Sequence, residues 1–191
     1  MSENKKKIIV GISGASGAIY GIRLLEAFKE AGLETHLVIS KAGQITIAEE
    51  TGMKVEDVRN KADFSHPVGN VGASIASGSF KTMGMVIAPC SMHSLAEIAT
   101  GMSSNLLTRA ADVILKERRK LVLMVRETPF HTVHLRHMVT LSEMGAIIAP
   151  PLPAFYNNPE NLEDLVNHSV GRVLDLFDLE TSKIKRWVGI N

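Results

Sequence analysis

The sequence predicts an α/β protein built on one doubly wound, mostly parallel sheet. Short apolar runs rich in β-branched residues alternate along the chain with segments of helical periodicity, and Gly- or Pro-containing turns separate them. Such alternation with short connections is typical of a Rossmann-like or flavodoxin-like three-layer sandwich. We expect a single domain over residues 1–191, with residues 1–6 as a disordered tail.

The first half of the chain contains two predicted strands. Lys7–Ile12 and Glu34–Ile39 are apolar enough to be buried on both faces, as in a parallel sheet. Helical periodicity predicts helices at about 18–31, 44–50 and 55–62. Residues 63–83 are polar, Gly-rich and weakly periodic, so we expect a functional loop there.

The second half repeats this alternation. The predicted strands are 85–88, 120–125 and 146–149, and the predicted helices are 93–100, 106–119, 132–144 and 161–177. A Pro-rich turn at 150–153 separates the last strand from the last helix.

The composition is that of an ordinary globular protein, with 45% hydrophobic and 21% charged residues and a formal net charge of +1. This charge balance gives no indication of a nucleic-acid surface. The one cysteine, Cys90, excludes an intrachain disulfide and favours a reducing compartment. The apolar run Ile8–Val10 after the basic N-terminus is too short for a signal peptide or a membrane span, so a cytoplasmic location is expected.

Polar residues begin where the predicted strands stop. Ser91 follows strand 85–88 after Pro89 and Cys90, and Arg126 follows strand 120–125. Open α/β sheets bind ligands outside the carboxyl ends of their strands, so these residues mark a candidate site.

The helix between these two strands carries charges on one face. Arg109, Asp112 and Lys116 are three and seven residues apart, a spacing that aligns them along the helix. We interpret them as part of a site for an anionic ligand.

A glycine-rich turn follows the first strand, with Gly11, Gly14 and Gly17 in a loose form of the dinucleotide fingerprint. Such a turn lets backbone N–H groups approach a phosphate or a flat ring, although it also occurs as a simple strand-to-helix connection. The second strand ends in Ser40-Lys41 rather than in an acidic residue, which disfavours NAD and leaves a mononucleotide phosphate or a flavin.

A set of short motifs extends over nearly the whole chain. It comprises Gly14-Ala15-Ser16-Gly17-Ala18, Ser40-Lys41, Ala76-Ser77-Gly78-Ser79, Pro89-Cys90-Ser91, Arg109-Ala110-Ala111-Asp112-Val113, Leu115-Lys116-Glu117-Arg118, Arg126-Glu127-Thr128-Pro129, His134-Leu135, Pro153-Ala154-Phe155-Tyr156 and Arg186-Trp187. In this order and spacing the chain resembles the UbiX family of flavin prenyltransferases. The segments 62–66 and 77–80 resemble in particular the branch paired with phenolic-acid decarboxylases.

The resemblance implies an enzyme that joins a dimethylallyl group to N5 and C6 of reduced FMN. Dimethylallyl phosphate would be the donor, and prenylated FMN would serve a partner decarboxylase of the UbiD family. The family works without a metal and forms large homo-oligomers, commonly dodecamers, with sites built between subunits.

The resemblance also implies site residues. The flavin-binding set is Gly14, Ala15, Ser16, Ser40, Ser91, Met92, His93, Ser94 and Arg126. The set for dimethylallyl phosphate is Ser77, Gly78, Lys116, Tyr156 and Arg172. The catalytic set is Ser16, Glu50, Lys116, Arg126 and Glu127, in which Ser16 and Glu50 form a proton relay.

The residue types suit this chemistry. Departure of an allylic phosphate needs cations that stabilise the developing negative charge, and Lys116, Arg126 and Arg172 can supply them. Formation of the C6 bond releases a ring proton, which a carboxylate such as Glu50 can accept directly or through Ser16.

The chain departs from the family pattern in three places. Val71 stands where many members have a tryptophan over the prenyl group, and Val125 replaces a proline before Arg126-Glu127. His134-Leu135 is followed by Arg136-His137 rather than by Glu-Asn, which changes an acid to a base near an expected subunit contact.

The sequence also allows other interpretations of single residues and of the function. Cys90 is a possible nucleophile, although a cysteine after a buried strand more often serves packing. His131, His134 and His137 recur every three residues, but this is not an established metal-ligand spacing. The alternative functions are an FMN-dependent decarboxylase and a non-catalytic flavin carrier subunit of a decarboxylase.

Overall fold

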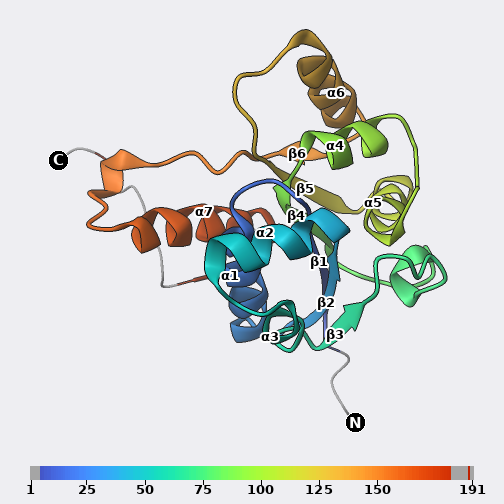
Figure 1. The fold of residues 1–191 in the computed structure, drawn as a ribbon, viewed down its shortest axis with the longest axis horizontal. Helices are drawn as coiled ribbons and strands as arrows, with labels where there is room; N and C mark the ends of the chain where they lie inside the picture. Colours follow the sequence, from blue (N-terminus) through green and yellow to red (C-terminus); the bar gives the residue numbers. More distant parts are fainter. Residues whose placement is uncertain (1–4, 182–188, 190–191) are drawn as a thin grey trace.

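The computed structural model describes residues 5–181 and residue 189. Its centre is a six-stranded sheet of order β3-β2-β1-β4-β5-β6 in which all neighbouring strands are parallel (Figure 1). The strands are β1 (Lys7–Ile12), β2 (Glu34–Ile39), β3 (Phe64–His66), β4 (Gly84–Cys90), β5 (Lys120–Val125) and β6 (Ile147–Ile148). This order is that of a doubly wound sheet, and it confirms the predicted fold class.

Helices and two short 3-10 turns connect the strands. They are α1 (Ala18–Glu30), α2 (Lys41–Thr51), α3 (Val55–Arg59), η1 (Ser74–Ala76), α4 (Met92–Ala99), α5 (Leu106–Lys116), α6 (Thr132–Glu143), η2 (Phe155–Asn157) and α7 (Leu162–Leu176). Among the described residues, no helix has both the length and the apolar character that a membrane span requires.

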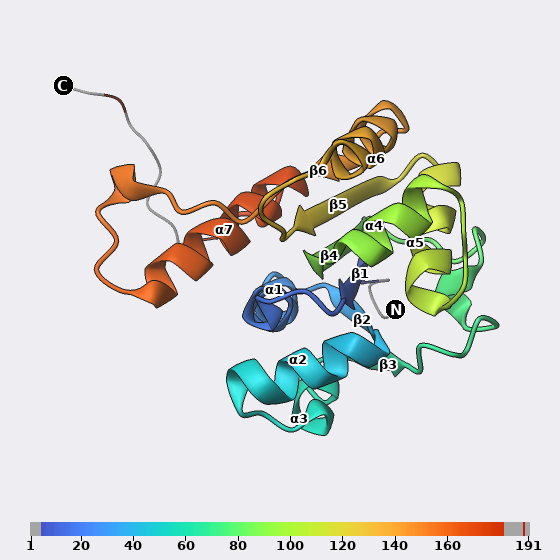
Figure 2. The ribbon, with the colours of Figure 1, turned by 45° about the horizontal axis from the view of Figure 1, so that its top comes forward.

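The sheet separates two hydrophobic clusters. Ile8, Val10 and Ile12 of β1 pack in the cluster that includes α1 and α7, whereas Ile9 packs in the cluster that includes α4 and α5. Successive side chains of a strand point to opposite faces, so β1 contributes to both clusters. Figure 2 shows α1 and α7 on one side of the sheet and α4 and α5 on the other.

The chain reverses its direction of winding at β1, which lies between β2 and β4. A buried serine ties the carboxyl ends of β1 and β4 together at this point. The Oγ of Ser13 donates to the Pro89 carbonyl at 2.7 Å and accepts from the Ser91 N–H at 2.8 Å. Ligands of open α/β sheets bind at such a switch point, so the fold places the candidate site here.

Some predicted boundaries were wrong. Residues 63–83 are not purely loop, because β3 adds a sixth strand at the edge of the sheet. Three residues are too few to show a period in the sequence. Helix α5 ends at Lys116 rather than at residue 119. Two residues after its end, Arg118 adopts a left-handed conformation with φ of 54°.

Residues 1–4, Arg186 and Trp187 lie outside the described residues. Within the expected tail, the carbonyl of Lys6 accepts a hydrogen bond from the N–H of Glu34 at 2.9 Å.

A pair of histidines, one buried and one half-buried, joins β3 to β2. His36 is 3% exposed, and its Nε2 lies 2.9 Å from Oε1 of Glu34. Its Nδ1 lies 3.0 Å from Nε2 of His66, and its ring stacks on Phe64 with the centroids 4.9 Å apart. Burial lowers the pKa of both histidines, for His36 in spite of the hydrogen bond to Glu34.

We expect the free energy of unfolding to fall as the pH drops below 6.5, the ordinary histidine pKa, towards the lower values of the folded pair. In that range the unfolded chain binds protons that the folded chain does not, which favours unfolding by about 1.4 kcal/mol per unit of pKa difference. Urea unfolding from about pH 7.5 to about 5.5 measures the slope. His66→Gln should give a shallower slope than the wild type, and equal slopes in the two proteins would contradict the prediction.

Candidate active site

Three helices begin at one cavity of about 540 Å³ at the carboxyl end of the sheet. Their N-caps, Ser40 of α2, Ser91 of α4 and Asn105 of α5, all line it. Each cap accepts a hydrogen bond from its own first turn, at 2.9 Å from Gly43 N, 3.3 Å from Ser94 N and 2.9 Å from Leu107 N. The positive ends of three helix dipoles therefore meet here, an arrangement that favours an anion such as a phosphate.

The glycine-rich turn forms another wall of this cavity, through Gly14. A Cβ at Gly14 would lie 2.3 Å from the Cβ of Ala42, so the turn packs against α2 as only glycine allows. Gly17, with φ of 102°, begins α1. Packing of the turn against α2 is what brings the loop after β1 up to the Ser40 cap.

Gly14→Ala should lower the free energy of unfolding by about 1–3 kcal/mol and weaken flavin binding, because the added methyl group forces α2 away from the turn. Thermal unfolding and FMN titration measure the two effects. The control is Gly72→Ala, whose Cβ would meet only Oδ1 of Asn70 at 3.6 Å, an ordinary contact. Wild-type stability and affinity in Gly14→Ala would refute the prediction.

Glu50 lies against the start of α1. Its Oε2 accepts from the N–H groups of Gly17 at 2.8 Å and Ala18 at 3.1 Å. Burial acts to raise the pKa of Glu50, but hydrogen bonds from Ser16, Gly17 and Ala18 and the charge of Arg126 outweigh it and lower the pKa. Glu50 is therefore a carboxylate at neutral pH, hydrogen-bonded to Ser16 and to the start of α1.

Arg126 lies at the carboxyl ends of two neighbouring strands. It follows β5, and its N–H donates to the carbonyl of Cys90, the last residue of β4, at 3.1 Å. Its side chain and that of Glu127 are exposed. The structure thus brings Arg126 to the edge where Ser16 and Glu50 lie.

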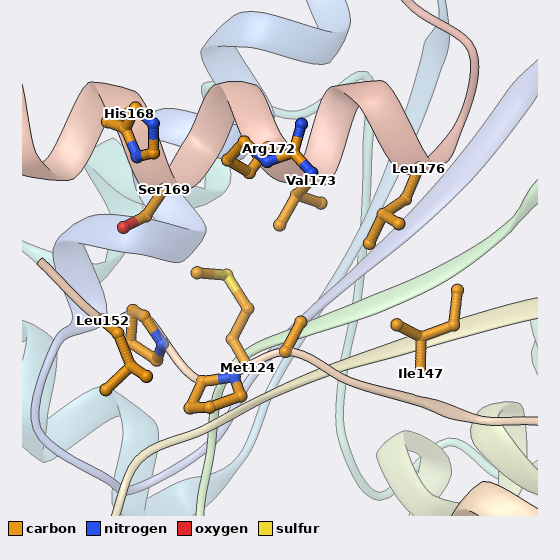
Figure 3. A pocket seen from close by; sticks show the side chains of 11 residues that line it. Met124, Ile147, Leu152, His168, Ser169, Arg172, Val173 and Leu176 are labelled. Atoms are coloured by element: carbon orange, nitrogen blue, oxygen red, sulfur yellow. The ribbon is translucent and has the colours of Figure 1, made fainter. Parts of the chain in front are cut away.

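A second cavity, of about 240 Å³, lies between α7 and the strands β5 and β6. His168, Ser169 and Arg172 line it from α7, and Met124 lines it from β5 (Figure 3). The hydroxyl of Tyr156 lies 3.1 Å from Nε2 of His168, which places Tyr156 beside this cavity. Burial and then the charge of Arg172 lower the pKa of His168, so its ring is neutral at neutral pH.

Tyr20 of α1 connects this cavity to the Glu50 region. Burial raises the pKa of Tyr20, while the charge of Arg126 and a hydrogen bond with Ser169 act to lower it. Arg126 therefore acts on both Glu50 and Tyr20, and Tyr20 contacts the second cavity through Ser169.

Lys116 stands apart from both cavities. Every residue of α5 is buried except Arg109, Asp112 and Lys116, which confirms the predicted common face. Lys116 Nζ is 2.6 Å from Oε1 of Glu117, and a Cβ at Gly78 would lie 2.9 Å from the same Nζ. The structure therefore brings together Lys116 and the predicted segment Ser77-Gly78.

Lys116 and Arg172 lie on opposite sides of the sheet. Lys116 is at the C-terminal end of α5, in the layer of one hydrophobic cluster, whereas α7 packs in the layer of the other. The eleven residues of α5 also put roughly 16 Å between Lys116 and the Asn105 cap. One copy of the chain thus does not bring Lys116 and Arg172 to one phosphate.

Known proteins are similar to this chain over nearly its whole length. The family model Flavoprotein matches residues 1–174. A flavin prenyltransferase UbiX from Thauera aromatica is 56% identical over 183 residues, covering 96% of this chain and 94% of that protein. A probable UbiX-like flavin prenyltransferase from Bacillus subtilis is 54% identical over 186 residues, covering 97% and 91%. The chain belongs to the UbiX flavin prenyltransferase family.

Solved structures of UbiX proteins superpose closely on this chain. AnUbiX (PadA1), in complex with FMN and dimethylallyl pyrophosphate, has a TM-score of 0.97 and 47% identity, covering 98% of this chain and 100% of its own. A dodecameric FMN-dependent UbiX-like decarboxylase from Escherichia coli O157:H7 has a TM-score of 0.94 and 52% identity, covering 96% and 100%. The cypemycin decarboxylase, at 14% identity and a TM-score of 0.64, shares the fold alone.

The structure disfavours two other interpretations of the sequence, a nucleophilic Cys90 and a metal site at His131 and His134. Burial raises the pKa of the Cys90 thiol to about 12, so the thiol stays protonated and is a poor nucleophile. His131 accepts from Val133 N at 3.2 Å and so caps α6, while its ring stacks on His134 with the centroids 3.5 Å apart. Packing and capping account for these residues.

Two residues of the candidate site were not predicted from the sequence. Ser13 is buried and joins the ends of β1 and β4. His168 links Tyr156 to the Arg172 cavity. His168 and Arg172 are four residues apart on one helix, a spacing from which His168 could have been predicted. No such signal indicated Ser13, because its hydrogen-bond partners are 76 and 78 residues away.

Proposed function

We propose that the protein is a metal-independent transferase that moves a dimethylallyl group from dimethylallyl monophosphate to N5 and C6 of reduced FMN, giving prenylated FMN. The observation that carries this proposal is the meeting of three helix N-termini beside the Ser16–Glu50 pair. The first feature suits a flavin phosphate, and the second suits removal of the ring proton at C6.

The residues present fit reduced FMN as a substrate. Gly14, Ser40, Ser91, His93 and Ser94 line the cavity, and Ala15, Ser16 and Met92 lie in the same two turns. The backbone approaches closely at Gly14, where a side chain would collide with α2. We place the phosphate of the flavin at the three caps and its ring towards Ser16, Glu50 and Arg126.

The positive side chains hold the prenyl donor. Arg172, with Tyr156 held at His168, binds the donor phosphate, and Lys116 and Arg126 neutralise the charge that develops as the phosphate departs. Glu127 follows Arg126 in the chain and lies beside the donor phosphate in this proposal. Glu50, which is ionised at neutral pH, accepts the ring proton through Ser16, with which it shares a hydrogen bond.

The active unit is a homo-oligomer. The separation of Lys116 from Arg172 by the sheet supports a site that takes these residues from different copies. The Escherichia coli relative is dodecameric, and we propose the same assembly for this protein. A UbiD-type aromatic acid decarboxylase would receive the product, and the protein would act in the cytoplasm.

The test is anaerobic incubation of the purified protein with reduced FMN and dimethylallyl monophosphate, followed by mass spectrometry of the released flavin. A flavin heavier by one prenyl unit supports the proposal. Parallel reactions with dimethylallyl diphosphate and without any donor identify the donor and the background. Unmodified FMN with both donors would overturn the proposal and favour a flavin carrier, and release of carbon dioxide from an aromatic acid by the chain alone would favour an FMN-dependent decarboxylase.

A further inference from the structure

Glu97 is a buried carboxylate behind the cavity of the three caps, and the chemistry described above does not use it. The residue lies on α4 and is 9% exposed. Its Oε1 accepts from the Oγ of Ser104 at 2.7 Å, and its Oε2 accepts from Nδ2 of Asn105 at 3.3 Å. One helical turn before it, Nε2 of His93 lies 3.7 Å from Oε1. His93, Ser104 and Asn105 all line the cavity, so one carboxylate contacts three residues of its wall.

The buried carboxylate of Glu97 lies beside a cavity that we assign to an anion, an arrangement that is unfavourable unless other contacts compensate. It costs free energy unless donors satisfy it, and it opposes binding of a second anion. Both oxygens of Glu97 are engaged by donors from the segment that joins α4 to α5. Residues 101–104 of that segment are exposed, and Glu97 supplies the segment with a buried side-chain attachment.

The contact with Asn105 fixes which way its amide points. Oδ1 of Asn105 accepts from the N–H groups of Leu107 at 2.9 Å and Thr108 at 3.2 Å, while Nδ2 donates to Glu97. A flipped amide would put its NH2 group against the helix N–H groups and its oxygen against the carboxylate. Glu97 therefore favours the one orientation in which Asn105 caps α5.

We propose that Glu97 is a positioning residue for the phosphate of the flavin. By holding Ser104 and Asn105, it keeps the start of α5 directed at the cavity together with the starts of α2 and α4. Glu97 does not touch the flavin; it acts through Asn105. This inference rests on the proposed function, since it takes FMN as the molecule that fills the cavity.

Glu97→Gln tests the proposal with the smallest change of shape. The new amide can accept from Nδ2 of Asn105 through its oxygen and donate to the Ser104 hydroxyl through its NH2 group. The variant therefore keeps the shape but replaces the charge-assisted hydrogen bond to Asn105 with a weaker neutral one. We expect the Kd for FMN to rise about tenfold, the difference between a charge-assisted and a neutral hydrogen bond at Asn105, whereas removal of the negative charge alone would lower the Kd. The Kd for riboflavin, which lacks the phosphate, should stay at the wild-type value, and so should the prenylation rate at saturating FMN.

Two further variants separate positioning from general stability. Glu56→Gln changes an exposed glutamate of α3 and should leave both flavin affinities unchanged. In Asn105→Ala the effect of adding Glu97→Gln should largely disappear, because the residue through which Glu97 acts is already missing. Thermal unfolding of each variant shows that the titrated protein is folded.

The outcomes that overturn the inference differ from those that overturn the function. Equal losses of affinity for FMN and riboflavin in Glu97→Gln, or an FMN affinity within about twofold of wild type, would leave Glu97 as a structural residue only. A wild-type chain that does not bind or prenylate FMN would overturn the proposed function itself. A wild-type chain that prenylates FMN beside a Glu97→Gln variant of unchanged FMN affinity would overturn the positioning role alone.

Discussion

Glu50→Gln should slow prenylation of FMN by about 100-fold or more, the usual range for loss of a general base. Glutamine is the same size and can still accept hydrogen bonds from the N–H groups of Gly17 and Ala18 through its amide oxygen. It cannot take up the proton that leaves the flavin ring. The measurement is the single-turnover rate of flavin prenylation under anaerobic conditions, with FMN affinity determined separately.

The neighbouring glutamate provides a matched control. Glu49 lies next to Glu50 on α2 and is exposed, so Glu49→Gln makes the same chemical change away from the start of α1. It should retain the wild-type rate. A wild-type rate in Glu50→Gln would show that another group accepts the proton, whereas loss of FMN binding in that variant would show that Glu50 mainly maintains the turn at Gly17.

Two inactive variants should restore activity when they are assembled together. Lys116→Ala and Arg172→Ala each remove a cation of the proposed phosphate clamp, and each homo-oligomer should lose at least about 100-fold in rate. In a mixed oligomer, some sites receive Lys116 from one copy and Arg172 from another. If the two residues come from different subunits, random mixing restores up to about a quarter of the wild-type rate.

The mixing experiment depends on exchange between copies. The two variants are unfolded together and refolded as a mixture, and each variant is refolded alone as the control. Lys81→Ala, which changes an exposed lysine in the loop before β4, should be as active as wild type and should not alter the mixture. A mixture no more active than its components would place Lys116 and Arg172 in separate sites and would remove Lys116 from the donor clamp.

Much of the fold could be read from local sequence because the relevant signals are local. The buried runs of β1, β2, β4 and β5 and the helical periods between them predicted a doubly wound sheet, which the structure confirms. The common face of Arg109, Asp112 and Lys116 follows from the helical repeat alone, and burial of the rest of α5 confirms it. β3 was missed because three residues carry no period.

The candidate site could be predicted only in part, because several of its contacts join residues far apart in the sequence. Spacing and strand ends indicated Ser40, Ser91 and Arg126, and the family resemblance added Ser16 and Glu50. Neither indicated that Ser13 would join two strands or that Glu97 would contact Ser104 and Asn105. Those contacts depend on where a loop or a helix end lies after the chain has crossed the sheet.

The sequence by itself determined which segments are strands and helices, which residues follow the strands, and which side chains share a helical face. These properties depend on backbone geometry with a period of two or 3.6 residues. Only the tertiary structure decided that three N-caps meet at one cavity and that Lys116 and Arg172 lie on opposite sides of the sheet. The path of each crossover sets the layer in which a helix packs, and the packing of that layer, rather than any local pattern, sets which distant residues meet.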